Sequence, residues 1–207
     1  SMKVLLINGS PHEKGCTYTA LSLIAGELKE QGIETEILHV GGQPVGGCIG
    51  CGGCRSGNGC VFGGVVNEAI EKAKTADAFV FGSPVHYASA AGNMASFMDR
   101  LAYAGGKYLA YKPAAICCSA RRAGTTSTLD QLVKYPQFFH MPLVNGSYWA
   151  MVHGSNPEQV LQDAEGCAVM QELGRNMAWL LRCIEAGKAA GIDHPQNPPR
   201  PMTSFIR

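Results

Sequence analysis

Residues 3–17 read KVLLINGSPHEKGCT, and this stretch decides the fold. Its first part, Lys3 to Asn8, is a short and almost wholly apolar run, which is typical of a strand buried on both faces. A loop containing Gly9 and Gly15 follows, and a helical pattern begins at Thr17. The first turn of a helix has free N–H groups, and glycines let the backbone approach a ligand closely. This junction therefore predicts an anion-binding site.

The rest of the chain repeats the alternation of strand and helix. This alternation predicts a parallel sheet with helices on both faces. Right-handed crossovers then favour a flavodoxin-like three-layer α/β sandwich, with a five-stranded parallel sheet of order 2-1-3-4-5. Further strands are expected at 34–40, 78–81, 114–118 and within 143–152, and helices at 17–31, 65–75, 91–103, 128–134 and 157–190, the last broken near Gly166.

We expect residues 1–207 to form a single domain, because no linker or internal repeat divides them. Two segments depart from the alternation. Residues 41–64 are rich in glycine and cysteine and have no periodicity, so they are expected to form a loop. Residues 157–207 are expected to form a C-terminal helix and a tail, because four prolines from Pro195 to Pro201 exclude a helix there.

Composition restricts the partners of the chain. Charged residues make up 16% and hydrophobic residues 46%, so we expect further copies to cover apolar surface, in a homodimer or homotetramer. The net charge of +1 gives no electrostatic basis for binding nucleic acid or an anionic membrane. The sequence has no apolar run of transmembrane length and no signal-peptide pattern, so we expect a cytoplasmic protein.

The loop after the first strand is the first candidate site. Ser10 and Thr17 offer hydroxyl donors beside the expected helix N-terminus. The loop contains neither the Gly-Lys-Ser/Thr of a Walker loop nor a dinucleotide fingerprint, so it suits a single phosphate better than a pyrophosphate. The loop residues leave one alternative open, which is a plain glycine–serine turn with a helix cap.

Three segments together resemble the NADPH-dependent FMN reductase family. The departures from the family pattern are His12, Cys16 and His86, where the family commonly has arginine, asparagine and tyrosine. The similar segments are Gly9-Ser10-Pro11 with Gly15-Cys16-Thr17, Gly82 to Tyr87 with a helix ending near Asp99-Arg100, and Ser119 to Thr125.

The resemblance implies that FMN lies at the carboxyl ends of strands one, three and four. The flavin carries the chemistry, so no catalytic side chain is assigned. The basic pair Arg121-Arg122 is either a solvated loop face or a contact for a nicotinamide phosphate or a donor protein. The residues expected to bind FMN are Ser10, Pro11, His12, Cys16 and Thr17 at the phosphate, Pro84, Val85, His86, Tyr87 and Ala88 along the ring, and Ser119, Ala120, Arg121, Gly124 and Thr125 on its other side.

The glycine-rich loop holds the second candidate site. Cys48, Cys51, Cys54 and Cys60 have the spacing Cys-x2-Cys-x2-Cys-x5-Cys, which resembles that of iron–sulfur flavoproteins, a branch with the same FMN fold. Four thiolates in a short loop suit a 4Fe–4S cluster. Two alternatives stay open: a zinc site, which more often pairs two Cys-x2-Cys knuckles across a longer gap, and a loop that binds no metal.

The resemblance implies an FMN-dependent NAD(P)H oxidoreductase that passes electrons through bound FMN to a small-molecule acceptor. The alternative is an iron–sulfur flavoprotein that transfers electrons with ferredoxin-like partners. A plain flavodoxin-type carrier fits less well, because flavodoxins are usually strongly acidic and lack such a cysteine loop. The residues leave the acceptor, and the choice between NADH, NADPH and a protein donor, open.

Overall fold

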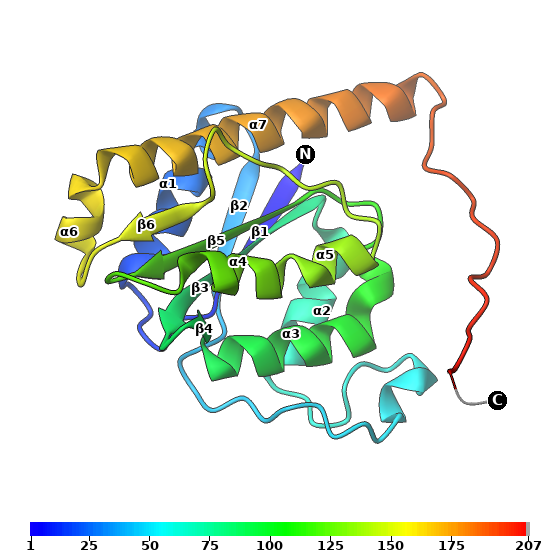
Figure 1. Cartoon of the computed structure of the whole chain (residues 1–207). Coiled ribbons are helices and arrows are strands. Elements are labelled where there is room, and N and C mark those ends of the chain that lie inside the picture. Colours follow the sequence, from blue (N-terminus) through cyan, green and yellow to red (C-terminus); the bar gives the residue numbers. More distant parts are fainter. Residues whose placement is uncertain (206–207) are drawn as a thin grey trace.

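A parallel sheet forms the centre of the molecule (Figure 1), whose computed structural model describes residues 1–205. Five strands pair in parallel in the order β2-β1-β3-β5-β6, and the short β4 pairs antiparallel with β3 at the end of that strand. The predicted order 2-1-3-4-5 of the parallel strands is therefore confirmed. The strands are β1 (Lys3–Asn8), β2 (Glu34–His39), β3 (Ala78–His86), β4 (Ser89–Ala90), β5 (Ala114–Ala120) and β6 (Met151–His153).

Helices cover both faces of this sheet, as the alternation predicted. One face carries α1 (Cys16–Glu30), α6 (Pro157–Gln162) and α7 (Ala164–Ala189), and the other carries α2 (Val65–Thr75), α3 (Gly92–Gly105), α4 (Thr125–Leu132) and α5 (Lys134–Phe138). Two 3₁₀ helices, η1 (Gly53–Ser56) and η2 (Gly106–Tyr108), lie in connections. No helix within residues 1–205 is long and apolar enough to cross a membrane.

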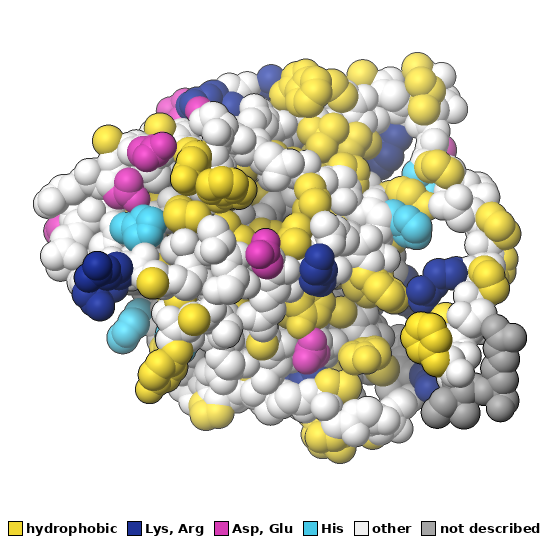
Figure 2. Space-filling model, viewed as in Figure 1, with side chains coloured by type: hydrophobic (Ala, Val, Ile, Leu, Met, Phe, Trp, Pro, Cys, Tyr) yellow, Lys and Arg dark blue, Asp and Glu magenta, His cyan; other side chains and the backbone are white. Residues whose placement is uncertain are grey.

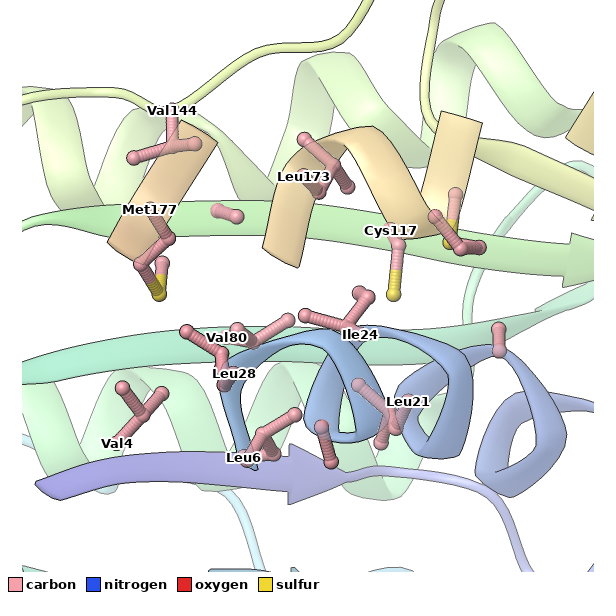
Figure 3. Close-up of a cluster of buried hydrophobic side chains, with 14 of the residues drawn as sticks. Val4, Leu6, Leu21, Ile24, Leu28, Val80, Cys117, Val144, Leu173 and Met177 are labelled. Atoms are coloured by element: carbon pink, nitrogen blue, oxygen red, sulfur yellow. The ribbon is translucent and has the colours of Figure 1, made fainter. Parts of the chain in front are cut away.

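The two cores explain the unbroken apolar run of β1. Val4 and Leu6 point to the face under α1 and α7, where they pack among residues such as Ile24 and Met177 (Figure 3). Their neighbours, including Leu5, point to the opposite face, under α2 and α3. Successive side chains of a strand face opposite sides, so a strand covered on both sides needs apolar residues at every position.

The third strand is longer than predicted. It runs to His86 instead of ending at Phe81, because Gly82 still pairs with Asn8 of β1 and Pro84 with Ser119 of β5. The turn-forming types in Gly82-Ser83-Pro84 suggested an end to the strand, but pairing on both sides keeps it extended. The hairpin that joins β3 to β4 had no predicted counterpart.

Later boundaries also differ from the prediction. Helix α4 begins at Thr125, before the expected 128–134, and the fifth parallel strand is only Met151–His153, with one isolated bridge between Leu143 and Ala114. The long helix is broken at Asp163, three residues before Gly166 and close to the predicted break, because the Asp163 side chain accepts the Gly166 N–H and caps α7. Residues 192–205 contain no helix, as the prolines predicted.

Candidate functional site

The three segments that resemble the flavin site meet at the carboxyl edge of the sheet. The Gly9 N–H donates to Gly82 O at 2.9 Å, which joins the first segment to the second. The second and third also touch, because a Cβ added at Gly124 would lie 2.8 Å from the Cα of Ala88. The hydroxyls of Thr17 and Ser119 are 2.8 Å apart and join the first to the third. The tertiary structure thus brings together segments that are far apart in the sequence.

Asn8 shapes the loop between β1 and α1, and the sequence analysis did not single it out. Its side chain is completely buried, accepts the Ser10 N–H at 3.0 Å and donates to Glu13 O at 2.9 Å. Nε2 of His39, at the end of β2, lies 2.7 Å from Ser10 O. A polar residue ending an apolar strand was the available signal for Asn8, because a buried amide needs partners.

The N-terminus of α1 retains the donors that a phosphate requires. No side chain caps this end, and within residues 1–205 the N–H groups of Thr17 and Tyr18 have no hydrogen-bond acceptor, whereas the N–H of Cys16 contacts only its own thiol. Such donors are normally satisfied by a cap, water or a ligand, and the helix dipole favours an anion there. Pro11 and His12 are exposed beside them. These features fit the phosphate of FMN.

The Cys16 thiol is not available as a donor to the phosphate. Its Sγ lies 3.6 Å from Gly154 O, after β6, and burial raises the pKa of the thiol. The neutral thiol therefore links the first turn of α1 to the loop after β6, and what Cys16 can offer to an anion is its backbone N–H. The Ser10 hydroxyl already accepts the His12 N–H at 3.1 Å, which still leaves its own O–H as a donor.

The β3–β4 hairpin presents the residues expected beside the flavin ring. His86, Tyr87 and Ala88 are exposed, and Pro84 and Val85 are half-buried. Tyr87 has φ 58°, a left-handed conformation that is uncommon for a non-glycine residue, in the turn between His86 and Ser89. Ser127 of α4 donates its hydroxyl to Ala88 O and holds the hairpin.

The third segment combines a buried base with an exposed basic turn. Ser119, Ala120 and Thr125 are buried, whereas Arg121 and Arg122 are exposed. Figure 2 shows basic and His side chains at the end of the molecule where β5 and β6 end in Figure 1, with Asp and Glu side chains close by. The exposed Arg121 and Arg122 can attract an anionic group to this edge.

The cysteine loop begins at the flavin edge and then follows α3 away from it. Asn93, near the start of α3, accepts the Val45 N–H and donates to Gly41 O and Gln43 O. Arg100 contacts the loop further along the same helix. Eight residues of α-helix separate Gly92 from Arg100, which corresponds to about 12 Å. The cysteines are therefore displaced along α3 from the flavin edge where their loop begins.

All four loop cysteines line one cavity of about 550 Å³. Asp99, Arg100 and Tyr103 of α3 form its other wall, and Ile49, Val61 and Phe62 expose apolar side chains around it. Within residues 1–205, no three His, Cys, Asp or Glu side chains converge closely enough for a single metal ion. The four cysteines therefore share the lining of one cavity without forming a preformed site for a single ion.

The thiol of Cys60 lies in a cationic environment. Burial alone would raise its pKa, but the Phe62 N–H and the Arg100 guanidinium, whose Nε is 3.3 Å from Sγ, donate hydrogen bonds to it. Their combined effect holds the pKa of Cys60 below its ordinary value. This environment therefore favours the thiolate form of Cys60, which is the form in which cysteine reacts and binds metals.

Residues 2–156, three quarters of the chain, match the model of the family described as NADPH-dependent FMN reductase. The chain belongs to this family. It is accordingly a flavin-dependent oxidoreductase with FMN as its cofactor and a flavodoxin-like fold.

The chain is also similar to particular relatives. It is 28% identical over 192 residues to an iron-sulfur flavoprotein of Methanocaldococcus jannaschii, a match that covers 89% of this chain and 100% of that protein. An iron-sulfur flavoprotein of Archaeoglobus fulgidus is 36% identical over 99 residues, covering 48% of each chain.

Solved structures with lower identity share the fold. One is RosB with a bound riboflavin-phosphate intermediate, with a TM-score of 0.69, 14% identity and coverage of 100% of this chain and 94% of that one. Another is the NADH:FMN oxidoreductase EMOB in its apo form, with a TM-score of 0.62, 18% identity and coverage of 88% and 90%.

Proposed function

We propose that this protein is an iron–sulfur flavoprotein that transfers electrons between a 4Fe–4S cluster and FMN. Cys48, Cys51, Cys54 and Cys60 would hold the cluster. The observation that carries the proposal is their shared cavity, whose wall contains the buried cation Arg100. Relatives named iron-sulfur flavoproteins support it, one of them along its whole length. When bound, FMN accepts and releases one or two electrons and the cluster exchanges one.

The chain's own residues would position FMN from three sides. The N–H groups of Cys16, Thr17 and Tyr18 and the hydroxyl of Ser10 would hold the phosphate, with Pro11 and His12 beside it. Residues 84–88 would lie along the ring, with Tyr87 covering it. Residues 119–125 would close the opposite side, with Ser119, Ala120 and Thr125 as the buried base. None of these side chains needs to act as an acid or base.

The exposed position of the cysteine cavity favours a protein partner for the cluster. Apolar side chains around its mouth and its displacement along α3 would let a ferredoxin-like protein approach without entering the flavin site. Exchange with such a partner would then be separate from any chemistry at the flavin.

A second candidate is direct reduction of FMN by NAD(P)H, followed by transfer to a small-molecule acceptor. The exposed pair Arg121 and Arg122 favours it, because guanidinium groups bind phosphates of a nicotinamide cofactor well. The family name points in the same direction.

Anoxic reconstitution of the full chain with FMN, iron and sulfide tests both candidates. The expected result is one FMN and four irons per chain, with the iron lost and the FMN retained in Cys51→Ser. Recovery of FAD, or of stoichiometric zinc with no iron, would contradict the proposal. Rapid bleaching of the flavin by NADPH in Cys51→Ser would establish the second candidate, and its loss in an Arg121→Ala, Arg122→Ala variant would assign the phosphate contact.

A further inference from the structure

Arg100 is the one arginine of α3, and it turns inward to the cysteine loop. Its side chain is only 7% exposed. The Nε donates to Cys60 Sγ at 3.3 Å, Nη1 to Gly46 O at 3.1 Å and Nη2 to Gly63 O at 3.1 Å. The Phe62 ring lies beside it, with its centroid 5.9 Å from the guanidinium carbon. The planar guanidinium thus contacts three separate points of one loop.

Two of those points lie on either side of the whole cysteine segment. Gly46 precedes Cys48, and Gly63 follows Cys60, so the hydrogen bonds join the start of the segment to its end. Closing a flexible loop costs conformational entropy, and a rigid helix that fixes both ends supplies this closure before any metal binds. The loop is rich in glycine, so it gains more order from such a clamp than an ordinary loop would.

The charge of Arg100 has no carboxylate partner. Among residues 1–205 no Asp or Glu forms a salt bridge with it, and the adjacent Asp99 instead accepts a hydrogen bond from the Tyr135 hydroxyl. A buried cation is costly unless an anion lies nearby. The same cavity is lined by Asp99, which forms no salt bridge with Arg100, and by four thiols, so thiolates that bind a cluster would be the nearest compensating anions.

We propose that Arg100 is a positioning residue for the iron–sulfur site: it clamps residues 46–63 and donates a hydrogen bond to the sulfur of Cys60. The inference rests on the function proposed above. Cys60 is then the preorganised ligand, whereas Cys48 and Cys51 are exposed and held mainly by the clamp. A donor to a ligand sulfur stabilises the reduced, more negative cluster, so Arg100 raises the reduction potential.

The test compares Arg100→Gln and Arg100→Lys with the wild-type full chain. The matched control is Arg55→Gln, which removes the same charge from an exposed residue of the same cavity that donates to no cysteine sulfur. After anoxic reconstitution, Arg100→Gln should shift the midpoint potential to more negative values, measured by electron paramagnetic resonance during redox titration. Its iron should pass to a chelator at least about tenfold faster. Arg100→Lys should be intermediate, and Arg55→Gln should change both measurements less than Arg100→Gln does.

A second readout uses the iron-free protein. Trypsin can cut after the exposed Arg55, which lies inside the clamped segment, and this cut should be faster in Arg100→Gln if the clamp orders the loop. FMN binding shows whether each variant is folded. If Arg100→Gln does not fold, the midpoint potential of Arg100→Lys tests the inference instead.

The outcomes separate the two proposals. A wild-type chain that takes up no iron overturns the proposed function and this inference with it. A wild-type cluster whose potential and release rate are unchanged in the folded Arg100 variants overturns this inference alone.

Discussion

The hydroxyl groups of Thr17 and Ser119 lie 2.8 Å apart, although 102 positions separate the two residues in the sequence. Both side chains are buried. Thr17 belongs to the first turn of α1, next to the expected phosphate, and Ser119 to the end of β5, next to the third flavin segment. One hydrogen bond therefore holds two walls of the proposed FMN site at a fixed spacing.

Removing either hydroxyl should weaken the site. Thr17→Ala and Ser119→Ala each leave one buried hydroxyl without its partner, and each should lower the free energy of unfolding by about 1–3 kcal/mol. FMN affinity should fall about tenfold in both. The double variant should lose less stability and less FMN affinity than the sum of the two single losses. Urea unfolding measures the stability, and fluorescence titration measures the affinity. Thr17→Ser, which keeps the hydroxyl, is the control. Strictly additive losses would show that the pair is not coupled.

A methyl group at Gly41 should displace the phosphate loop. Its Cβ would lie 2.4 Å from the carbonyl oxygens of both Gly9 and Ser10, and backbone atoms cannot move aside cheaply. We expect Gly41→Ala to lose roughly 1–3 kcal/mol of stability and most of its FMN affinity. Gly26 lies in the middle of α1, and a methyl group there meets open space. Gly26→Ala should therefore raise the free energy of unfolding by about 0.5–1 kcal/mol. Equal effects in the two variants would refute this reading.

Tyr87 should lower the stability of the FMN-free protein and strengthen FMN binding. Its left-handed backbone is strained and its side chain is fully exposed, so Tyr87→Gly should stabilise the FMN-free protein by about 0.5–1 kcal/mol. The same variant should bind FMN more weakly, because the aromatic ring that we propose to cover the flavin is lost. Tyr87→Phe keeps both the ring and the strain and should behave like wild type. Unchanged FMN affinity in Tyr87→Gly would show that the Tyr87 ring does not contact the flavin.

Glu36 should make stability depend on pH. The hydrogen bonds from Lys3 and then Lys72 hold the pKa of Glu36 below its ordinary value of 4.5. A lowered carboxyl pKa stabilises the fold above the unfolded value, and this stabilisation is lost as pH falls through the folded value. Glu36→Gln should therefore cost about 0.5–1 kcal/mol at pH 7 and progressively less below pH 4.5. Glu71→Gln, in an exposed pair with Lys74, should change stability less. A cost that is independent of pH would contradict the assignment.

We also predict that the chain forms at least a dimer. Trp149 and Trp179 are largely exposed, as is Leu161, and apolar surface of this kind is usually covered by a partner. Light scattering of the FMN-bound protein at micromolar concentration should give a mass of at least two chains, and Trp179→Glu should lower it if α7 forms the contact. A monomer with bound FMN would refute the prediction.

Patterns of neighbouring residues in the sequence predicted the sheet, its strand order and the two candidate sites. An apolar run such as Lys3 to Asn8 has to be buried on both faces, so the doubly covered parallel sheet and its strand order could be predicted. The anion site followed from Gly9, Ser10 and a helix start, and the metal-site hypothesis from four closely spaced cysteines. In each case the signal lies within a few neighbouring residues.

The remaining features depend on contacts between distant residues, which no local pattern records. Pairing with β1 and β5 extended β3 through Pro84, and the capping side chain of Asp163 moved the helix break. The hydrogen bond between the hydroxyls of Thr17 and Ser119 forms only because the start of α1 and the end of β5 meet at one edge of the sheet. Arg100 shows the limit most clearly. No pattern in the sequence assigned it a partner, and only the folded loop shows that it lies on the buried side of α3 with Cys60 as its partner. The sequence determined which residues could bind cofactors, and the tertiary structure decided which of them face one another, because hydrogen bonds and charges act through space.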